Sequence, residues 1–476
     1  MMENIFVDQK KNYNANFGFI FRSSAIFYII NKKIKTTISI FNYWKIKNNL
    51  DVTILITFRD LDGSVKKKSN YEFQHSNVLN ITHYPFVEGS LEIEVFGNKN
   101  LKIPYAAVMC VYENKSSISQ IHSYTRNHSL IEIENKDAIT HVFESCWTTG
   151  EIKDNIEYFL IFHNGHSEIE AQAGELSLTN FEGKEKKIRL KLKKIKKFET
   201  LKINYTKYLK KYKKFFKNQF AYGSINFKNY SSFSRMMHMK ILKSEDDIQV
   251  THTNFNYSVV KTNFISENQS LMKIPNLNDD IDKYFTIVYP KRAKGNFTAH
   301  QIDKDKIVLK KNRPVIFKND FQSKKIIFHS KLKKFPSRIV TGLYGFADNN
   351  KIPFECSVGI AHPQRAAKRF QWGIIGHDHD SKIYIEGYDE YYEIPKKIIV
   401  KFRLYSSNRT KYLEKIFEYE SFGQIPRKFI LKDLFKNFKS FLNNNYGYMS
   451  IWSNFEGFLV YLLLRKKKSV SLEHYF

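Results

Sequence analysis

The chain has 476 residues, 42 % of them hydrophobic and 16 % aromatic, which is enough for about three domains with substantial cores. The aromatic content favours strands over helices, and with 19 Gly and 10 Pro the composition excludes collagen-like and disordered classes. The net charge of +30 suggests an anionic partner, but the excess is mostly Lys and accompanies abundant Asn, Ile, Phe and Tyr. Since nucleic-acid readers favour Arg, we favour compositional drift as the source of this charge, with a selected anion-binding surface as the alternative.

The cysteines and the N-terminal region bear on compartment and membrane association. Cys110, Cys146 and Cys356 lie far apart, which fits neither a disulfide framework nor zinc-ligand spacing, so we expect a reducing, cytoplasmic environment. The first residues lack the basic-then-apolar order of a signal peptide, and the apolar stretch 17–30 is too short to span a bilayer. We expect no membrane span.

Two sequence pieces recur in the same order in the first half of the chain. An apolar strand ends at Asn42 and again at Asn164, and each is followed by a strand that runs into an acidic turn with Gly63 or Gly183. A strand, a turn and a second strand fill such a spacing. Because self-similarity of this kind marks duplicated units, the pattern predicts repeated modules.

A third piece occurs three times, beginning with a Gly-led strand. The glycines are Gly89, Gly223 and Gly447. Each is followed by an apolar strand and then by a strand that carries a histidine, namely His122, His252 or His474. The apolar residue lies two positions before the histidine in the second and third copies, whereas Ile121 is adjacent to it in the first. Because a one-residue slip reverses the sheet face, copy one has either a bulge or a histidine that is not equivalent.

A helical pattern precedes the Gly-led strand in the second and third copies. Spacings of three and four place the apolar residues of each segment on one helix face, namely Leu209, Tyr212 and Phe216 in one and Leu434, Phe438 and Phe441 in the other. Copy one has Pro85 and too few residues for a helix there. From Ile188 to Lys193 apolar and basic residues alternate strictly, as in a half-buried antiparallel strand.

These elements predict an all-β protein of tandem antiparallel β-sandwich modules that arose by internal duplication, with a short helix in modules two and three. We expect module one at 1–130, module two at 131–260 and module three at 325–476, each with its own hydrophobic interior. Residues 261–324 are expected to form a connecting segment with some strands.

The module resembles the β-sandwich of the sensory-rhodopsin-transducer family. The resemblance rests on the strand that ends at Asn42 or Asn164, the turns at 60–63 and 181–183, and the late strands with His122 and His252. It covers about half of each module and does not extend to the Asn-terminated strand in module three. The resemblance implies a non-enzymatic binding or signalling partner with a carbohydrate-binding role.

Two sets of histidines are candidate sites. His122, His252 and His474 recur near module ends, either as ligand-contacting residues or as sheet-rim residues bonded to the backbone. His377, Asp378 and His379 could bind a divalent metal, with His362 or Asp389 as a third ligand. The alternative for this second set is a polar turn, because Gly, Asp and Ser are typical turn residues.

The densest basic tract is a further candidate, because it combines a strand face and a helix face. The strand face carries Arg189, Lys191 and Lys193, and the helix face carries Lys207, Lys210, Lys211 and Lys214. This ridge could contact phosphate or an acidic glycan, or it could be a solvated face of a Lys-rich protein. Cys146 with His163 or His166 could form a thiol–base pair, although Cys is more often a buried hydrophobe.

We therefore expect a non-catalytic, cytoplasmic binding protein without a cofactor, whose ligand is carbohydrate-like or anionic, or a protein partner. It would bind through loops at the sandwich ends. The first alternative is a metal-dependent enzyme centred on His377, Asp378 and His379. The second is nucleic-acid binding by the basic ridge. The sequence does not determine the oligomeric state.

Overall fold

The computed structural model describes the greater part of the chain. The described residues are 21–73, 76–98, 101, 103–122, 125–127, 143–148, 152–217, 222–228, 232–244, 247–253, 264–265, 269–289, 297–301, 305–310, 313–318, 325–331, 335–336, 340–347, 352–359, 369–376, 380–390, 392–467 and 469–475. Within them, all strand ladders are antiparallel, and the strands form eight sheets of four or more strands and one two-stranded sheet. The expected all-β, antiparallel fold class is confirmed.

The strands of the first half fall into two units with the same order of pairing. Unit 1 contains β1 (Phe21–Ile30), β2 (Lys35–Phe41), α2 (Tyr43–Asn48), β3 (Thr53–Asp60), β4 (Val65–Tyr71), β5 (Val78–Ile81), β6 (Glu88–Gly97), η1 (Tyr105–Ala107), β7 (Val108–Glu113) and β8 (Ile118–Ile121). Unit 2 contains β10 (Phe143–Thr148), β11 (Ile156–His163), β12 (Gln172–Thr179), β13 (Glu185–Leu192), β14 (Thr200–Asn204), α4 (Thr206–Lys211), α5 (Lys213–Phe216), β15 (Tyr222–Phe227), β17 (Met237–Leu242) and β18 (Ile248–His252).

The second half repeats this arrangement twice more. Unit 3 contains β20 (Gln269–Lys273), β21 (Lys283–Tyr289), β22 (Phe297–Gln301), β23 (Ile307–Val308), β24 (Val315–Lys318), β25 (Lys325–Ser330), β27 (Val340–Phe346) and β28 (Phe354–Gly359). Unit 4 contains β29 (Phe370–Ile375), β30 (Asp380–Gly387), β31 (Ile398–Tyr405), β32 (Leu413–Tyr419), η4 (Phe422–Gln424), β33 (Lys428–Ile430), α7 (Leu431–Leu434), α8 (Phe438–Leu442), β34 (Gly447–Ser453), β35 (Phe458–Lys466) and β36 (Ser469–His474).

Numbering the eight main strands within each unit shows one topology throughout the described chain. Strands pair in the order 1-6-3-4 in one sheet and 5-2-7-8 in the other, in all four units. Residues 261–324 therefore supply strands β20 to β24 to sheets completed by β25, β27 and β28, so the strand pairing groups the chain into four units where three were expected. The third unit was missed because it lacks the Gly-led strand and the terminal histidine of the other copies.

Short strands link successive units. After unit 1, β9 (Thr125–Asn127) pairs with β1 and with β16 (Ser232–Ser234) of unit 2. After unit 2, β19 (Phe264–Ile265) pairs with β26 (Phe335–Pro336) of unit 3. In both cases the linker pairs with a segment between strands 6 and 7 of the following unit, so units 1 and 2 are joined to their successors in the same way.

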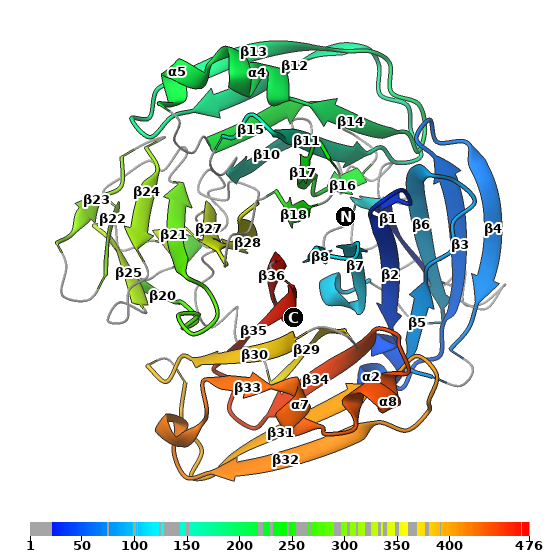
Figure 1. Cartoon of the computed structure of the whole chain (residues 1–476), viewed down its shortest axis with the longest axis vertical. Coiled ribbons are helices and arrows are strands. Elements are labelled where there is room, and N and C mark those ends of the chain that lie inside the picture. Colours follow the sequence, from blue (N-terminus) through cyan, green and yellow to red (C-terminus); the bar gives the residue numbers. More distant parts are fainter. Residues whose placement is uncertain are drawn as a thin grey trace, which may run out of the picture.

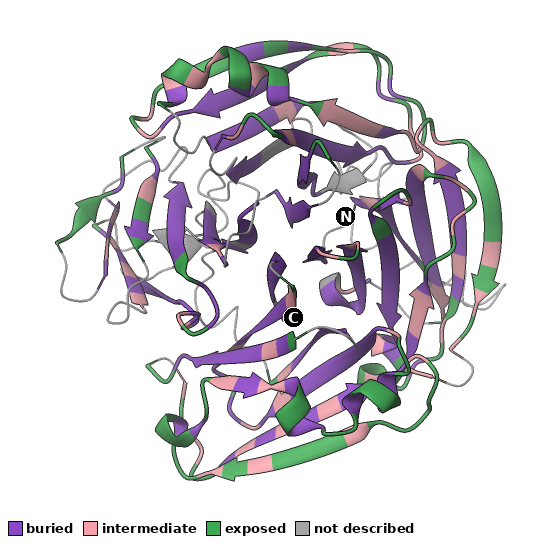
Figure 2. Ribbon diagram, in the orientation of Figure 1, coloured by how far each residue is buried: buried purple, intermediate pink, exposed green. Residues whose placement is uncertain are grey.

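The units pack around a common centre in chain order (Figure 1). Strands β8, β18, β28 and β36 lie nearest the centre and each contacts two of the others, whereas β4, β13, β23 and β32 lie at the periphery. Figure 2 shows the same gradient as burial, with exposed residues concentrated on the outer strands and helices. Among the described residues, no helix is long and apolar enough to cross a membrane.

The hydrophobic interior is not divided by unit, contrary to our expectation. One core cluster joins the inside of unit 1 to Phe159 and Met239 of unit 2, and another joins unit 4 to Phe41 and Met109 of unit 1. Further clusters join unit 2 to unit 3 and unit 3 to unit 4. Many sheets therefore bury apolar residues on both faces, so the units sandwich against each other as well as within themselves.

The repeated turn and Gly motifs have direct structural causes. Gly63 and Gly183 adopt φ of +88° and +82° in the turn after strand 3, a conformation that other residues rarely adopt. A Cβ on Gly89 or Gly447 would lie 2.3 Å from the carbonyl oxygen of strand 3, at Arg59 and Tyr405 respectively. These two glycines are therefore required by the close approach of strands 6 and 3.

The helical patterns before strand 6 are confirmed, each as two short consecutive helices. Leu209 and Phe216 are buried on α4 and α5, and Tyr212 lies at the break between the two helices. In unit 4, α7 and α8 bury Leu434 and Phe441 in the same position of the topology. Unit 1 has no helix there, as expected, but Asn42 caps α2 by accepting a hydrogen bond from Lys45 N.

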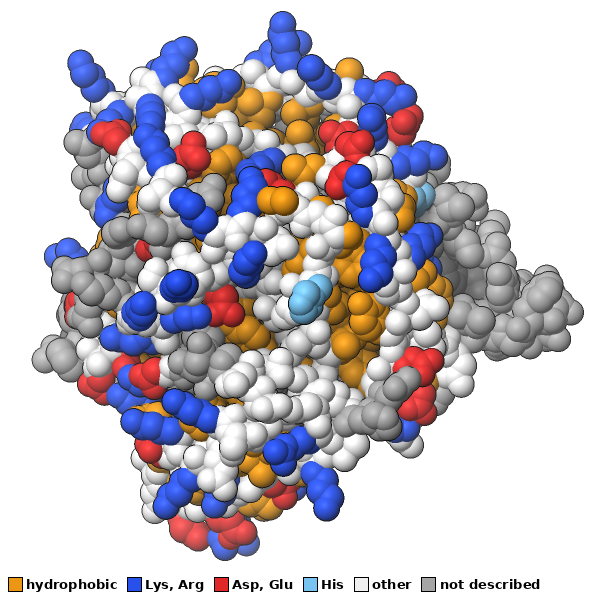
Figure 3. Space-filling view, turned by 45° about the vertical axis from the view of Figure 1, so that its right-hand side comes forward, with side chains coloured by type: hydrophobic (Ala, Val, Ile, Leu, Met, Phe, Trp, Pro, Cys, Tyr) orange, Lys and Arg blue, Asp and Glu red, His pale blue; other side chains and the backbone are white. Residues whose placement is uncertain are grey.

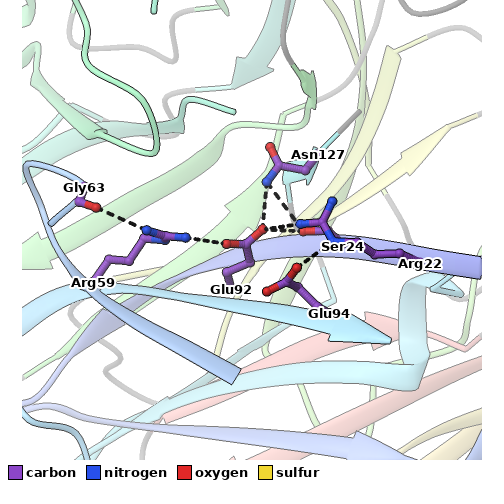
Figure 4. A network of polar contacts seen from close by, with 7 residues as sticks. All are labelled: Arg22, Ser24, Arg59, Gly63, Glu92, Glu94 and Asn127. Carbon is purple, nitrogen blue, oxygen red and sulfur yellow. Dashed lines mark hydrogen bonds and ion pairs between the residues drawn. The ribbon is translucent and has the colours of Figure 1, made fainter. Parts of the chain in front are cut away.

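A buried polar network lies on the face of unit 1 that meets unit 2 (Figure 4). Glu92 is 1 % exposed and accepts hydrogen bonds from Arg22, Ser24, Arg59 and Asn127 at 2.6–3.2 Å. These residues come from β1, β3, β6 and β9, so one carboxylate joins four strands of the sheet. Arg22 and Ser24 are the polar residues within the apolar stretch 17–30, and their place in that stretch is explained by this network.

Candidate functional site

The three repeated histidines meet at the common centre around which the four units pack. His122 follows β8, His252 ends β18 and His474 ends β36. The ring of His122 lies 4.7 Å from that of His252 and 5.0 Å from that of His474, edge to face in both cases. The histidines that recur in the sequence thus form one cluster in space, a contact between modules that the sequence pattern does not predict.

The question about His122 is resolved by the strand register. Pairing of β7 with β8 is regular, with Cys110 opposite Ile121 and no bulge. Gln120 occupies the position at which the other copies have Val250 and Leu472. A polar residue is tolerated there because every residue of β8 is buried, so its polar and apolar side chains need not alternate between a solvent face and a core face. His122 is therefore the equivalent residue, and the bulge is not needed.

Polar side chains complete the backbone bonding between the central strands. Val250 N donates to Ser119 Oγ at 2.9 Å, and Gln120 N donates to Ser471 Oγ at 2.9 Å. Gln249 Nε2 donates to the Val470 carbonyl at 3.0 Å. Side chains thus take the place of a ladder between neighbouring units, which satisfies buried backbone groups where four strands converge.

Residues that the sequence analysis did not single out complete the cluster. Glu473 Oε1 lies 2.9 Å from His474 Nδ1 and 3.3 Å from His122 Nδ1. Arg235 Nη1 lies 3.5 Å from His122 Nε2 and 3.4 Å from His252 Nε2. Cys356 Sγ of β28 lies 4.0 Å from Glu473 Oε1, so all four units contribute. The one available signal was Glu473, which immediately precedes a repeated histidine.

Burial governs the electrostatics of this cluster. His122 is fully buried, which lowers its pKa to about 4, and burial with the nearby Arg235 holds the pKa of His252 well below its usual value. Burial by itself raises the pKa of the Glu473 carboxyl, but the hydrogen-bonding His122 and His474 bring that pKa below its usual range. At neutral pH the Glu473 carboxylate therefore lies beside the neutral imidazole of His122, and Arg235 brings a positive charge to the opposite nitrogen of that imidazole.

Chemically, the arrangement offers a compact set of nitrogen and oxygen donors. One ligand atom each from His122, Glu473 and His474 lies within 4.8 Å of the other two. Two residues of this set are buried, while the side chain of His474 is 18 % exposed. The site can therefore hold an ion or a proton, but its burial leaves little room for an organic substrate.

The predicted cationic residues lie far from this centre, on the peripheral strand β13. Ile188 and Leu190 are buried while Arg189 and Lys191 are exposed, so the expected alternation is present, and Lys193 is exposed just beyond the strand. The helix residues of the expected ridge are exposed as well, namely Lys207, Lys210, Lys211 and Lys214. The strand and helix contact each other through Lys186, whose Nζ lies 5.2 Å from the ring centroid of Phe215.

A shallow depression of about 710 Å³ adjoins this row of cations. Its lining includes Gln172, Glu175, Arg189, Asn226 and Lys228. Lys187 at its edge is paired with Glu175 at 3.2 Å. The depression thus presents amide, carboxylate and guanidinium groups on one outer sheet face.

His377, Asp378 and His379 lie outside the described residues, as does His362, so the metal prediction there is untested. Asp389 forms an ion pair with Lys273 at 2.7 Å.

The suggested thiol–base pair is buried. Cys146 is 0 % exposed and packs in the cluster between units 2 and 3. His163 lies on β11 of the other sheet, with Nδ1 2.8 Å from Thr200 Oγ1, and burial lowers its pKa to about 3. His166 is on the segment that follows, and burial with the nearby Arg22 lowers its pKa as well. A nucleophile without access to substrate cannot act, so we assign Cys146 to packing.

Comparisons with models of protein families and with curated proteins found no match for this chain. The candidate sites therefore rest on the geometry of the structure alone.

Proposed function

We propose that this protein is a non-catalytic binding protein that holds a carbohydrate-like polyanion on the outward face of β13. The observation that carries the proposal is the cation row, defined as Arg189, Lys191 and Lys193. All three side chains are exposed, and none forms an ion pair with an acid among the described residues. Neighbouring lysines are compensated, with Lys187 bound to Glu175 and Lys194 bound to Glu168.

The spacing of the row suits an extended ligand. Alternate residues of a strand lie about 6.7 Å apart on one face. A flexible chain whose anionic groups are spaced at about the same distance would place each successive anionic group against one cation of the row. Figure 1 places unit 2 at the top of the molecule. Many Lys and Arg side chains project from this upper edge in Figure 3.

The adjoining depression favours a glycan over a single-stranded nucleic acid. Gln172, Glu175 and Asn226 can exchange hydrogen bonds with hydroxyl groups. Phe227, the aromatic residue of the lining, is 3 % exposed and offers no stacking platform. Proteins that bind single strands use exposed aromatic rings on which bases stack.

Two further observations support the non-catalytic and cytoplasmic parts of the proposal. The buried ion pair of Lys240 with Glu355, at 2.7 Å, and the buried Glu473 are both enclosed, whereas a catalytic group must reach its substrate. Cys110, Cys146 and Cys356 are buried thiols, which fits a reducing compartment. The resemblance to the transducer family implies the same kind of non-enzymatic binding.

The test is a salt-dependent binding assay with heparin and polygalacturonate as acidic glycans, dextran as a neutral glycan and a single-stranded oligonucleotide. Wild-type protein should bind the acidic glycans, with affinity falling as salt rises. The double variant Lys191→Ala/Lys193→Ala should reduce the slope of log affinity against log salt by about two. The matched control is Lys397→Ala/Lys415→Ala beside the corresponding strand 4 of unit 4, which should leave the slope unchanged.

Two outcomes would overturn the proposal. An equal reduction of the salt-dependence slope in the two double variants would show that binding depends on overall charge and not on the cation row. Binding of the oligonucleotide without binding of either acidic glycan would favour the nucleic-acid alternative.

A further inference from the structure

The central histidine cluster differs from the other buried polar groups of the described chain in its donor set. The Glu92 network consists of a carboxylate saturated by arginine, amide and hydroxyl donors. In the cluster, by contrast, two imidazole nitrogens approach the same carboxylate oxygen from separate strands. Imidazole and carboxylate are also the ligands from which proteins build zinc sites.

We propose that this centre is a binding site for a divalent transition-metal ion of zinc's chemical class, held by His122 Nδ1, Glu473 Oε1 and His474 Nδ1. This assignment is independent of the cation row, because the row is exposed at the rim and the cluster lies where the four central strands converge.

The donor separations fit such an ion. Zinc bonds of about 2.0–2.1 Å in a tetrahedron place neighbouring ligand atoms roughly 3.3 Å apart. His122 Nδ1 and Glu473 Oε1 are separated by 3.3 Å, and His474 Nδ1 and Glu473 Oε1 by 2.9 Å. The first separation is longer than the roughly 2.7–2.9 Å of a charge-assisted N–H···O bond. Small side-chain shifts would therefore complete three corners of a tetrahedron.

The donor types also decide which ions fit. Calcium and magnesium prefer sites made of oxygen ligands, which this cluster does not provide. Two imidazoles and one carboxylate suit zinc, cobalt and related ions, with the fourth corner left to water. The side chain of His474 is 18 % exposed, so the fourth corner and the entry path lie on its side. Cys356 Sγ lies 4.0 Å from Glu473 Oε1 and is not one of the three ligand atoms that converge.

Arg235 is the residue that controls affinity. An arginine N–H always donates, so its approach to His122 Nε2 makes that nitrogen the acceptor and leaves the imidazole proton on Nδ1, facing Glu473. When an ion binds Nδ1, this proton moves to Nε2 and Arg235 must withdraw from it. The imidazole remains neutral and no proton is lost from His122. Arg235 thus competes with the metal through tautomer and charge.

The test uses full-length protein, calorimetric titration with zinc, and cobalt as a spectroscopic probe, because its visible absorption reports tetrahedral coordination. Wild-type protein should bind one equivalent at the centre. His474→Ala and Glu473→Gln should each weaken binding by more than about tenfold, and Arg235→Met should strengthen it by about 10–100-fold, as expected for a residue that acts on the ligands. Thermal unfolding with and without zinc checks that each variant folds.

The controls address other histidines. His300 and His329 stack with ring centroids 5.2 Å apart on unit 3, and His83 is exposed on unit 1. His300→Ala and His83→Ala should leave the affinity and the cobalt spectrum unchanged. Binding that survives His474→Ala but is lost in His300→Ala would overturn the proposal. Absence of binding in both wild-type protein and a folded Arg235→Met variant would overturn it too.

Discussion

The junctions between units and the outer rim contain the same kinds of charged residue in opposite surroundings. At the junction of units 1 and 2, Glu92 is 1 % exposed and accepts hydrogen bonds from both Arg22 and Arg59. On the rim, Lys191 and Lys193 are solvated. Since unpaired charge is costly in the interior and nearly free in water, junction polar groups should control stability and rim groups binding.

The largest expected effect comes from removing the charge at the junction. Glu92→Ala leaves the buried Arg59 without a carboxylate partner and removes one of the two carboxylates that bind Arg22, which should cost about 3–5 kcal/mol of unfolding free energy. The matched rim variant, Glu175→Ala, removes an exposed ion pair with Lys187 and should cost less than about 1 kcal/mol. Denaturant unfolding of both variants compares the two regions directly, and similar losses would contradict the contrast.

The next effect concerns backbone packing. Gly447→Ala places a Cβ against the carbonyl oxygen of Tyr405 and should destabilise the protein by about 1–3 kcal/mol. Near the rim, Gly174→Ala meets the flexible Leu192 side chain at 3.2 Å and should change stability by less than about 0.5 kcal/mol. The measurement is again denaturant unfolding. A loss from Gly174→Ala as large as that from Gly447→Ala would remove the distinction.

Acid should weaken the interior through His163. Its folded-state pKa of about 3 lies below the ordinary 6.5, so the unfolded chain binds the proton first as pH falls. The contribution of His163 to the free energy of unfolding is fully present above pH 6.5 and declines progressively towards pH 3. At one pH unit below 6.5, the loss from this residue is about 1.4 kcal/mol. Unfolding titrations from pH 7.5 to 5.5 on wild type and His163→Gln should show a shallower pH dependence in the variant, and identical slopes would refute this.

The smallest stability effect is expected from the cation row itself. Lys191→Ala/Lys193→Ala should change the unfolding free energy by no more than about 0.5 kcal/mol, because both side chains are solvated. The same variant is expected to lose affinity for acidic glycans. A large loss of stability would mean that the row is structural.

Several features of the fold were predictable because they depend on local constraints. The alternation at 188–193 requires a half-buried strand, and the turn glycines need a backbone conformation with positive φ. The third unit carries neither the Gly-led strand nor the histidine, so the segment 261–324 was read as a connection. Glu473, Arg235 and Cys356 were missed because the contacts of Arg235 and Glu473 with His122, and of Cys356 with Glu473, join residues more than a hundred positions apart.

The sequence by itself determined the strand class and the order of the repeated elements, including the recurrence of a histidine at His122, His252 and His474, but it left open whether His122 is equivalent to the other two. Only the tertiary structure decided that the units number four in the described chain and that these histidines meet. The reason is that strand pairing uses backbone N–H and C=O groups, which almost every residue type carries. A unit can therefore keep its topology without the glycine and histidine that mark the other copies. The packing of the four units around a common centre then brings the ends of distant strands together.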